Sequence, residues 1–588
     1  MKLSDFVMQF LSDEGIKVIF GVTGGAVVHL FDSAKKTGIE CVFTHHEQAA
    51  AFAAGGYARI HGLGSAIFTT GPGGTNSITG VAAAWLDSIP IIYLGGQVRS
   101  NHIKPSNLRQ LGVQELDVVG IISPIVKYAK TLMHPSEIRY ELEKCLHFAT
   151  SGRPGPVYLE IPLDLQWAEI EKDKLSAFVP EKTVASDDAQ IHQVLNKLGQ
   201  ARRPLLLLGA GIRLAGALLE LEQFLKKRAI PYVTTWNITD AVQWDDPLNL
   251  GRPGMFGNRA ANIAIQTCDF LCCLGTHLSN AVTTPNYEQF APKAEVALIN
   301  IDPHVLEHQR VKIDYSLCSD ALCFLQAAIA SSEDSCIKEW QIKCKTLKLR
   351  FQDESIGSSE ERALDAYGVL SQLNELFASD DIIVVDGGGT IVQIASQGVK
   401  LRKGQRFIID SGLCAMGSGL PQAIGAAFVN RQRRVICLCG DGSLQFNIHE
   451  LQVMKHHNLP IKLFIYSNDG YQSIVNTQKN LFDGKFTAVN SVSGVSCPDF
   501  VKIGMAYGIK SIHIDNHYDM EEKIKYVLNY PGPIICEINT VRVLMLTPKL
   551  MAKKLPNGQF ASPPLEDMGP FLSREEFKKN MLIPLWEE

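Results

Sequence analysis

Short apolar runs alternate with amphipathic segments along most of the chain, and many of the runs end in Gly, Ser, Thr or Asn. They include KVIFGV, SAIFTT, PIIYLGG, PLLLLGAG, FLCCLG, VALINID, IIVVDGGG, VICLCGDGS, IKLFIYSND and PIICEIN. Such runs are typical of strands buried in a parallel sheet and joined by helices. The pattern predicts an α/β protein with doubly wound parallel sheets, in which ligand crevices open at the carboxyl ends of the strands.

Two polar stretches interrupt this alternation, near residues 165–188 and 345–363. They divide the 588-residue chain into three segments of ordinary domain size, and we predict domains at residues 1–170, 186–345 and 362–545. After Asn539 the alternation stops, so residues 546–588 are predicted to form a polar tail. The tail is either a surface arm or a lid over a cleft, with the apolar anchors Phe560, Leu565, Met568 and Phe571.

The charges are well mixed, with 56 basic and 61 acidic residues and a formal net charge of -5. This balance disfavours nucleic acid or an anionic membrane as a partner and favours a small molecule. Asp5, Asp13 and Glu14 interrupt the N-terminal apolar segment, so we predict no signal peptide and a cytoplasmic protein. The fourteen cysteines include no CxxC pair, and several lie in apolar runs, which predicts buried free thiols.

The strongest chemical signal is VICLCGDGSLQFNIHELQVMKHHNLPIKLFIYSNDGY. Asp441 follows one buried run and Asn468 follows the next, so a crossover helix would make the two strands parallel neighbours with both side chains at one edge. Two nearby oxygen ligands suit Mg²⁺, which leaves its other positions to phosphate oxygens and water. The glycines allow close approach of backbone N–H groups to a phosphate. A lone GDGS could be an ordinary strand-to-helix turn, but the pair predicts a magnesium-diphosphate site.

This pair resembles the thiamine diphosphate (ThDP) motif, and nearly the whole chain resembles the acetolactate synthase branch of ThDP enzymes. The resemblance rests on GVTGGAVVHLFD, HHEQAAAFAAGGYAR, TTGPGGTNSITGVAAAWLDSIPIIYLGGQV, VQELDVVGI, SGRPGPVYLEIPLDLQ and GSGLPQAIGAA, in that order. It implies a pyrimidine-binding, a central and a diphosphate-binding domain. It also implies that Mg²⁺ is held by Asp441, Asn468 and the Gly470 carbonyl.

In that family, the Glu that matches Glu47 contacts the pyrimidine N1′ of the cofactor and so favours loss of the C2 proton. Burial among the small residues that follow Glu47 would let it share a proton with N1′, and those residues would make room for the ring. The alternative is a Glu placed at a helix N-terminus by the helix dipole.

The resemblance implies further roles near the cofactor. Met416 would hold the bent conformer, and the Cys414 carbonyl would accept from the 4′-amino group, unless Met416 is only a core side chain. Gln114 matches a Gln near the reacting carbon, although a surface Gln is the alternative. The remaining predicted cofactor contacts are Gly24, Gly25, Gly389, Thr390, Gly440, Gly442, Ser443 and Tyr471.

The central domain resembles one that holds FAD as a structural group. The resemblance assigns FAD contacts to Gly209, Ala210, Gly211, Met255 and Asp302. The chain departs from the family pattern where GTHLSNAV puts His277 and Ala281 in the places of two arginines. An ADP-type nucleotide or an empty cleft therefore remain alternatives.

The resemblance implies a carboligase that decarboxylates pyruvate and transfers the two-carbon acyl anion unit to a carbonyl acceptor. Where the family places an apolar and aromatic pattern, this chain has polar residues, which predicts an acceptor pocket at Ser473, Asn476, Thr477 and Gln478. A site that bonds hydroxyls favours a free or nucleotide-linked keto sugar, as in the surface-polysaccharide relatives that NTQKN and SPPLEDMGPF resemble. The alternatives are acetolactate synthase using pyruvate or 2-ketobutyrate, a cyclic dione C–C hydrolase and an inactive binding protein.

The family also implies a homodimer or homotetramer with active sites at the subunit interface.

Overall fold

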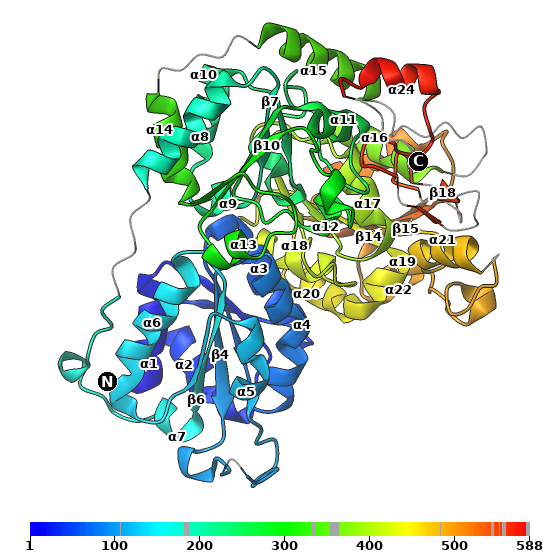
Figure 1. The fold of residues 1–588 in the computed structure, drawn as a ribbon. Helices are drawn as coiled ribbons and strands as arrows, with labels where there is room; N and C mark the ends of the chain where they lie inside the picture. Colours follow the sequence, from blue (N-terminus) through cyan, green and yellow to red (C-terminus); the bar gives the residue numbers. More distant parts are fainter. Residues whose placement is uncertain are drawn as a thin grey trace. The chain divides into compact units, whose positions relative to one another are not determined.

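The computed structural model describes residues 1–105, 107–180, 187–331, 337–352, 364–482, 484–541, 546–551, 553–554, 560–561 and 563–583 (Figure 1). The chain divides into two compact units. The first contains Met1–Lys182, Asp380–Ile391 and Ile408–Asn539. The second contains Thr183–Ser379, Val392–Phe407 and Thr540–Glu588.

The first sheet lies in the first unit and has the strand order β2-β1-β3-β4-β6-β5, with parallel ladders throughout. Its strands are β1 (Val18–Gly21), β2 (Glu40–Phe43), β3 (Gly64–Phe68), β4 (Ile91–Gln97), β5 (Tyr128–Thr131) and β6 (Pro156–Pro162). Its helices are α1 (Leu3–Asp13), α2 (Val28–Thr37), α3 (Glu47–His61), α4 (Pro72–Leu86), α5 (Val118–Ile122), α6 (Ile138–Thr150) and α7 (Leu163–Gln166).

The third sheet repeats this topology, with the order β13-β12-β14-β15-β17-β16 and parallel ladders from β12 to β16. Its strands are β12 (Ile382–Val385), β13 (Arg406–Ile409), β14 (Val435–Gly440), β15 (Ile461–Ser467), β16 (Lys510–Ile514) and β17 (Ile534–Asn539). Its helices are α16 (Ala366–Leu376), α17 (Gly389–Gly398), α18 (Gly419–Val429), α19 (Asp441–Leu444), α20 (Leu451–His456), α21 (Gln472–Leu481), α22 (Phe500–Ala506) and α23 (Met520–Asn529).

Helices α3 and α18 occupy equivalent places in the two repeats and pack directly against each other. A Cβ atom on Gly56 would lie 2.1 Å from the carbonyl oxygen of Gln422, and one on Gly425 would lie 1.8 Å from that of Ala53. Larger side chains at these glycines would push the two helix backbones apart. The small residues after Glu47 thus allow the close packing of α3 against α18.

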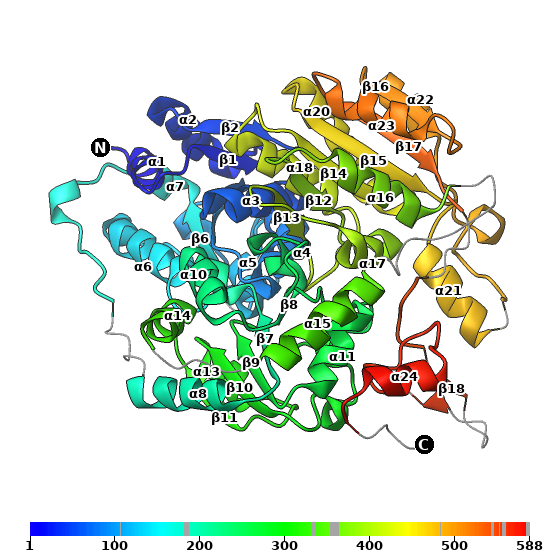
Figure 2. The same cartoon turned by 90° about the horizontal axis from the view of Figure 1, so that it is seen from above.

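The second sheet lies in the second unit, with the order β11-β10-β9-β7-β8 and parallel ladders (Figure 2). Its strands are β7 (Pro204–Leu208), β8 (Tyr232–Thr234), β9 (Phe270–Leu274), β10 (Glu295–Asn300) and β11 (Tyr315–Cys318). Its helices are α8 (Asp188–Gln200), α9 (Gly211–Leu214), α10 (Leu218–Arg228), α11 (Arg259–Thr267), α12 (Asn280–Thr283), α13 (Pro303–Glu307), α14 (Ala321–Ala330) and α15 (Lys338–Phe351). The three parallel sheets confirm the predicted fold class.

The polar stretch that was predicted to begin a linker near residue 345 begins as helix instead. Helix α15 continues to Phe351 because Leu347 and Phe351 are buried in the core of the second unit. Residues 181–186 and 353–363, in the two predicted linkers, lie outside the described residues. The predicted domain boundaries stay predictions.

The predicted tail at residues 546–588 contains short regular elements. Strand β18 (Lys553–Lys554) pairs antiparallel with β19 (Phe560–Ala561), and α24 (Arg574–Asn580) follows. Leu565 and Met568 are buried, because the tail packs on α11, where the Arg259 guanidinium donates to the carbonyl oxygens of Met568 and Pro570 at 2.9 Å.

This part of the tail is therefore not a free surface arm. Phe571 is exposed, and the side chain of Phe560 lies outside the described residues. A role of the tail as a lid stays a prediction.

The thirteen cysteines in the described ranges are free, and those in CDFLCC and CLCGDG are buried, as predicted. No helix in the described part of the chain is long and apolar enough to cross a membrane.

Candidate cofactor site

The third sheet has a topological switch point between β12 and β14, because the chain leaves β12 toward β13 on one side and returns to β14 on the other. Crevices at such points bind ligands beyond the carboxyl ends of the strands. The predicted contacts Gly389 and Thr390 follow β12, Gly440 ends β14, and residues 441–443 follow it. Strand β15 lies beside β14 and brings Asn468 to the same edge. The fold thus gathers the residues that the sequence assigned to diphosphate and metal.

The Asp441 carboxylate is held almost entirely by backbone N–H groups. Its Oδ1 accepts from Gly442 at 2.7 Å, and its Oδ2 accepts from Asn468 at 2.9 Å and Gly470 at 3.1 Å. Burial raises the pKa of Asp441, and these N–H donors lower it. Beside it, the Oδ1 atom of Asn468 is buried without a hydrogen-bond partner among the described residues. A buried oxygen that lacks a donor, next to a carboxylate, fits a small cation such as Mg²⁺.

The loop after Asn468 needs glycine for steric reasons. Gly470 has a φ of +127°, and a Cβ atom there would lie 2.3 Å from the carbonyl oxygen of Val489. The ring of Tyr471 lies against Gly442, where a Cβ atom would be 2.5 Å from Cε1 of the ring. Both glycines therefore hold the loop close to the turn after β14.

Thr390 lies at the start of α17, and its Oγ1 atom is buried without a partner among the described residues. Gly389 before it has a φ of +73° and an open space around its Cα. A free hydroxyl at a helix N-terminus is a suitable donor to a phosphate oxygen. These features fit the diphosphate of the predicted cofactor.

Asp386 joins these loops, and the sequence analysis missed it. The side chain is completely buried at the end of β12. Its Oδ1 accepts from Ser443 Oγ at 2.6 Å and from the N–H groups of Gly388 and Gly417 at 3.1 Å. Burial raises the pKa of Asp386, and its hydrogen bonds lower it. The hydroxyl of Ser443, a predicted cofactor contact, is thus directed at Asp386. In the sequence, the one signal for Asp386 was its position directly after the apolar run IIVV.

Cys414 and Met416 lie in the loop between β13 and α18. Cys414 is exposed and has a φ of +53°, and Met416 is half-buried. A Cβ atom on Gly388 would lie 2.3 Å from Cγ of Met416, so the side chain of Met416 packs over the turn after β12. The predicted roles of both residues remain proposals.

Glu47 is the first residue of α3 and is 8% exposed. Its Oε2 accepts from Asn76 Nδ2 at 3.0 Å, a contact from α4 that the sequence analysis missed.

At the switch point of the first sheet, a Cβ atom on Gly24 would lie 2.4 Å from Thr69 Oγ1, whereas the surroundings of Gly25 are open. Gly24 is therefore required by packing.

Gln114 is exposed on the loop after β4, and its backbone has a φ of +63°. Buried Gln97 holds this loop: its Oε1 accepts from Thr70 Oγ1 at 2.8 Å, and its Nε2 donates to the carbonyl oxygen of Leu116 at 2.8 Å. Thr70 Oγ1 also lies 3.2 Å from the carbonyl oxygen of Gln114. The Gln114 backbone is thus fixed, while its side chain faces outward.

Glu450 is a second carboxyl group near the start of α3. It is fully buried, its Oε1 accepts from the N–H of His45 at 2.9 Å, and its Oε2 has no partner among the described residues. Burial raises the pKa of Glu450 to about 8, so the group is largely protonated at neutral pH. The segment NIHEL carried no signal for this contact, because His45 lies 405 residues away in the sequence.

The predicted acceptor residues lie on α21. Thr477 Oγ1 donates to the carbonyl oxygen of Ser473 at 3.1 Å, and Asn476 Oδ1 accepts from Gln472 Nε2 at 3.2 Å. The Gln478 amide is occupied on both sides, because its Nε2 donates to the Thr487 carbonyl oxygen at 3.0 Å and its Oε1 accepts from the Thr487 N–H at 2.8 Å. Gln478 therefore fixes the following loop.

The predicted FAD residues have structural roles in the second unit. A Cβ atom on Gly209 would lie 2.2 Å from the carbonyl oxygen of Gly275, and one on Gly211 would lie 2.8 Å from the Cα of Gly275. Ala210 is the N-cap residue of α9, and Asp302 caps α13 by accepting from the N–H of His304 at 3.0 Å. The N–H of half-buried Met255 donates to the carbonyl oxygen of Ala281 at 3.1 Å. Close packing alone thus accounts for the two glycines.

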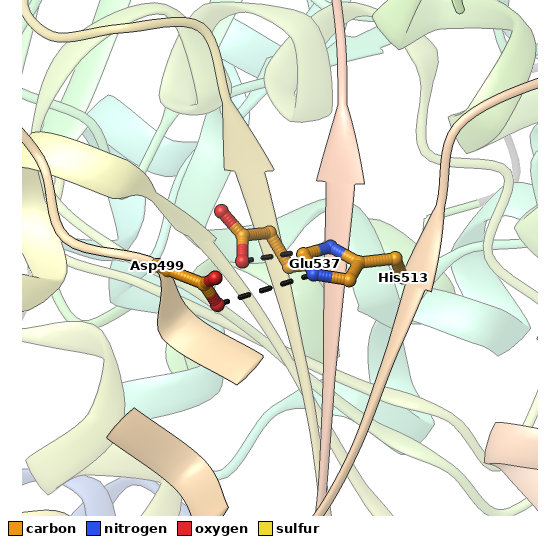
Figure 3. Close-up of side chains that lie close together, drawn as sticks. All are labelled: Asp499, His513 and Glu537. Carbon is orange, nitrogen blue, oxygen red and sulfur yellow. Dashed lines mark ion pairs between the residues drawn. The ribbon is translucent and has the colours of Figure 1, made fainter. Parts of the chain in front are cut away.

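A further polar cluster lies on the third sheet, outside the predicted site (Figure 3). His513 on β16 lies between Asp499 and Glu537, at 3.9 Å and 3.7 Å. Both carboxylates also accept from the first turn of α22, Glu537 from the N–H of Phe500 at 3.0 Å and Asp499 from that of Lys502 at 2.9 Å. The cluster therefore anchors the start of α22 on the sheet.

Comparison with known proteins identifies the family. Residues 1–121, 191–328 and 387–538 match the N-terminal TPP binding domain, the central domain and the C-terminal TPP binding domain of thiamine pyrophosphate enzymes. Over 542 residues the chain is 32% identical to the acetolactate synthase isozyme 2 large subunit of Escherichia coli, covering 92% of this chain and 95% of that protein.

It is 33% identical to the probable acetolactate synthase large subunit of Methanocaldococcus jannaschii, over 92% of each chain. The chain belongs to the acetolactate synthase-like ThDP enzymes. The predicted enzyme class and the predicted cofactor, thiamine diphosphate, are thereby confirmed.

Proposed function

We propose that the protein is a ThDP- and Mg²⁺-dependent carboligase that decarboxylates pyruvate and transfers the two-carbon unit to the carbonyl group of a keto sugar. The observation that carries the cofactor assignment is the edge of the third sheet. There, Asp441 is fixed by backbone donors, and the oxygens of Asn468 and Thr390 are buried without partners among the described residues.

ThDP, when bound, supplies a carbon nucleophile that adds to a keto group and accepts the electron pair left by departing CO₂. In this proposal Asp441, Asn468 and the Gly470 carbonyl hold Mg²⁺. Thr390 and the N–H groups at the start of α17 bind the diphosphate. Glu47, oriented by Asn76, shares the proton at N1′ of the pyrimidine.

The acceptor assignment rests on α21. Ser473, Asn476 and Thr477 give one end of this helix a polar surface, and Thr477 is exposed. We assign hydrogen bonds to acceptor hydroxyls to these three residues and leave out Gln478, whose amide is already bonded to Thr487. A site that bonds hydroxyls discriminates strongly against acceptors that lack them.

A second candidate is acetolactate synthase activity, with pyruvate or 2-ketobutyrate as the acceptor. The two relatives above favour it, because one is an acetolactate synthase large subunit and the other a probable one. The two candidates share the cofactor and the first substrate and differ only in the acceptor.

One incubation separates them. The enzyme is given ThDP, Mg²⁺ and pyruvate, with and without a nucleotide-linked 4-keto-6-deoxy sugar, and the products are identified by mass spectrometry. The proposal expects the sugar to gain C₂H₄O, with acetolactate as a minor product. Efficient formation of acetolactate with an unchanged sugar would establish the second candidate, and neither product would contradict both.

FAD and the oligomeric state belong to the proposal as well. We propose a homodimer or homotetramer in which exposed apolar side chains of the first unit, among them Phe43, Trp85 and Phe446, are covered by a second copy. Sedimentation measures the oligomer. The absorbance spectrum of the purified protein shows whether the second unit carries a flavin.

A further inference from the structure

The second unit contains a cavity of about 90 Å³ that no predicted cofactor residue lines. It lies among β8, α15, α16 and the last residues of α17. Its described lining includes three cationic side chains, Arg252, Lys348 and Lys400, and no acidic one. Buried cations are normally paired with anions, so a cavity lined in this way favours an anionic ligand.

The side chain of Arg252 is buried, and backbone carbonyl groups accept hydrogen bonds from one nitrogen of its guanidinium group. Its Nη2 donates to the carbonyl oxygens of Gln397 at 2.9 Å and Val399 at 3.0 Å, at the end of α17. Its Nε is buried without a partner among the described residues. Burial lowers the pKa of Arg252 to about 10. The guanidinium therefore keeps an unsatisfied donor and an uncompensated charge.

Lys348 has a similar environment on α15. Its Nζ donates to the carbonyl oxygens of Trp244 and Asp246, both at 2.5 Å, which leaves one of its three N–H bonds for a ligand. Burial lowers the pKa of Lys348 to about 8, although Asp246 and Asp245 act in the opposite direction. Neither aspartate lines the cavity.

The rest of the cavity wall combines apolar side chains with uncharged polar ones, such as Asn249, Ser371 and Asn374. Trp244, Phe351 and Leu370 line it, and the Nζ of Lys400 lies 4.7 Å from the centre of the Trp244 ring. A water molecule needs about 10 to 15 Å³ of such a cavity, so the space holds roughly six to nine water-sized groups. That is the size of a carboxylate with a short hydrocarbon chain.

We propose that this cavity binds a small carboxylate, with the carboxylate group on Arg252 and Lys348 and the hydrocarbon chain on Trp244, Phe351 and Leu370. An α-amino acid should be rejected, because no acidic side chain among the described lining residues can pair with its ammonium group. The site is independent of the proposed carboligase activity.

Calorimetry with four probes tests the ligand class. Isovalerate is the expected ligand, isovaleramide has the same shape without the charge, leucine adds an ammonium group, and inorganic phosphate lacks the hydrocarbon chain. We expect isovalerate to bind about 10- to 100-fold more tightly than each of the other three. Equal binding of isovalerate and isovaleramide, preferential binding of leucine or phosphate, or no binding of isovalerate would overturn the proposal.

Variants test the location. Lys348→Met should weaken isovalerate binding about tenfold or more, whereas Lys345→Met, an exposed position on the same helix, should leave it unchanged. Lys400→Met, at a half-buried position of the cavity wall, should also weaken isovalerate binding. It replaces Lys348→Met in the comparison with Lys345→Met if Lys348→Met does not fold. Unchanged affinity in the folded cavity variants would place the ligand elsewhere and contradict the assignment.

Discussion

The backbone N–H of Asn468 donates to Oδ2 of Asp441 at 2.9 Å, across the ladder between β14 and β15. This bond turns the carboxylate toward the end of β15, where the side-chain oxygen of Asn468 has no partner among the described residues. The Asp441 carboxylate is thus fixed by backbone donors, beside the Asn468 oxygen, before any ligand binds. A preorganised oxygen pair of this kind favours a small, rigidly coordinated cation.

Removal of either oxygen should therefore weaken metal and cofactor together. For Asp441→Ala and Asn468→Ala we expect ThDP affinity in the presence of Mg²⁺ to fall about 10- to 100-fold. Asp469→Ala is the matched control. Its carboxylate accepts a hydrogen bond from Ser491 and is not a predicted ligand, so this variant should bind ThDP normally. Equal ThDP affinity with Mg²⁺ and with EDTA would argue against the metal bridge.

Asn76 should act by orienting Glu47. Asn76→Ala removes the donor at 3.0 Å, so turnover should fall about tenfold while ThDP affinity stays unchanged. Thr75→Ala on the same helix is the control. A parallel loss of ThDP affinity would mean that Asn76 supports the fold of the site and not the carboxylate.

Glu450 should make stability depend on pH. Its pKa is raised from the usual 4.5 to about 8, so the folded protein keeps a proton that the unfolded chain releases above pH 4.5. Stability contributed by this group is complete below about pH 4.5, is lost as pH rises through about 8, and then levels off.

The urea midpoint of Glu450→Gln should therefore fall less than that of the wild type between about pH 5 and pH 8.5. Exposed Glu14→Gln should follow the wild type. Identical pH profiles for wild type and Glu450→Gln would show that the buried carboxyl group is ionised throughout this range.

The tail should contribute to the stability of the second unit. Leu565 is 2% exposed in its core, so Leu565→Ala should destabilise the protein by about 2 to 5 kcal/mol. Phe571→Ala, at an exposed position of the same tail, should cost far less. Similar thermal midpoints for wild type and Leu565→Ala would mean that this part of the tail is not packed on α11.

The sequence predicted those parts of the site that depend on neighbouring strands. Asp441 and Asn468 could be predicted to lie side by side, because a short crossover makes consecutive strands parallel neighbours. The parallel ladder between β14 and β15, in which Gly440 lies opposite Tyr466, confirms this pairing. The repeat of strand order in the first and third sheets was not visible, because topology leaves no periodic signal in the sequence.

The residues that sequence reasoning missed make contacts between distant segments. Asp386 bonds Ser443 from 57 residues away, and Arg259 bonds Met568 from 309 residues away. Periodicity describes the local face of a helix or strand and carries no information on such partners. The tail illustrates this limit: Leu565 and Met568 could be named as apolar anchors, but their burial against α11 could not be predicted.

The central claim is that Glu47 activates the cofactor while the third sheet holds it, and Glu47→Gln separates the two roles. ThDP affinity and CO₂ release from pyruvate are measured on the same preparation. Because the diphosphate and metal contacts are intact, affinity should stay within about threefold of wild type, while turnover falls by about 10² to 10⁴. Turnover near that of the wild type would contradict the account.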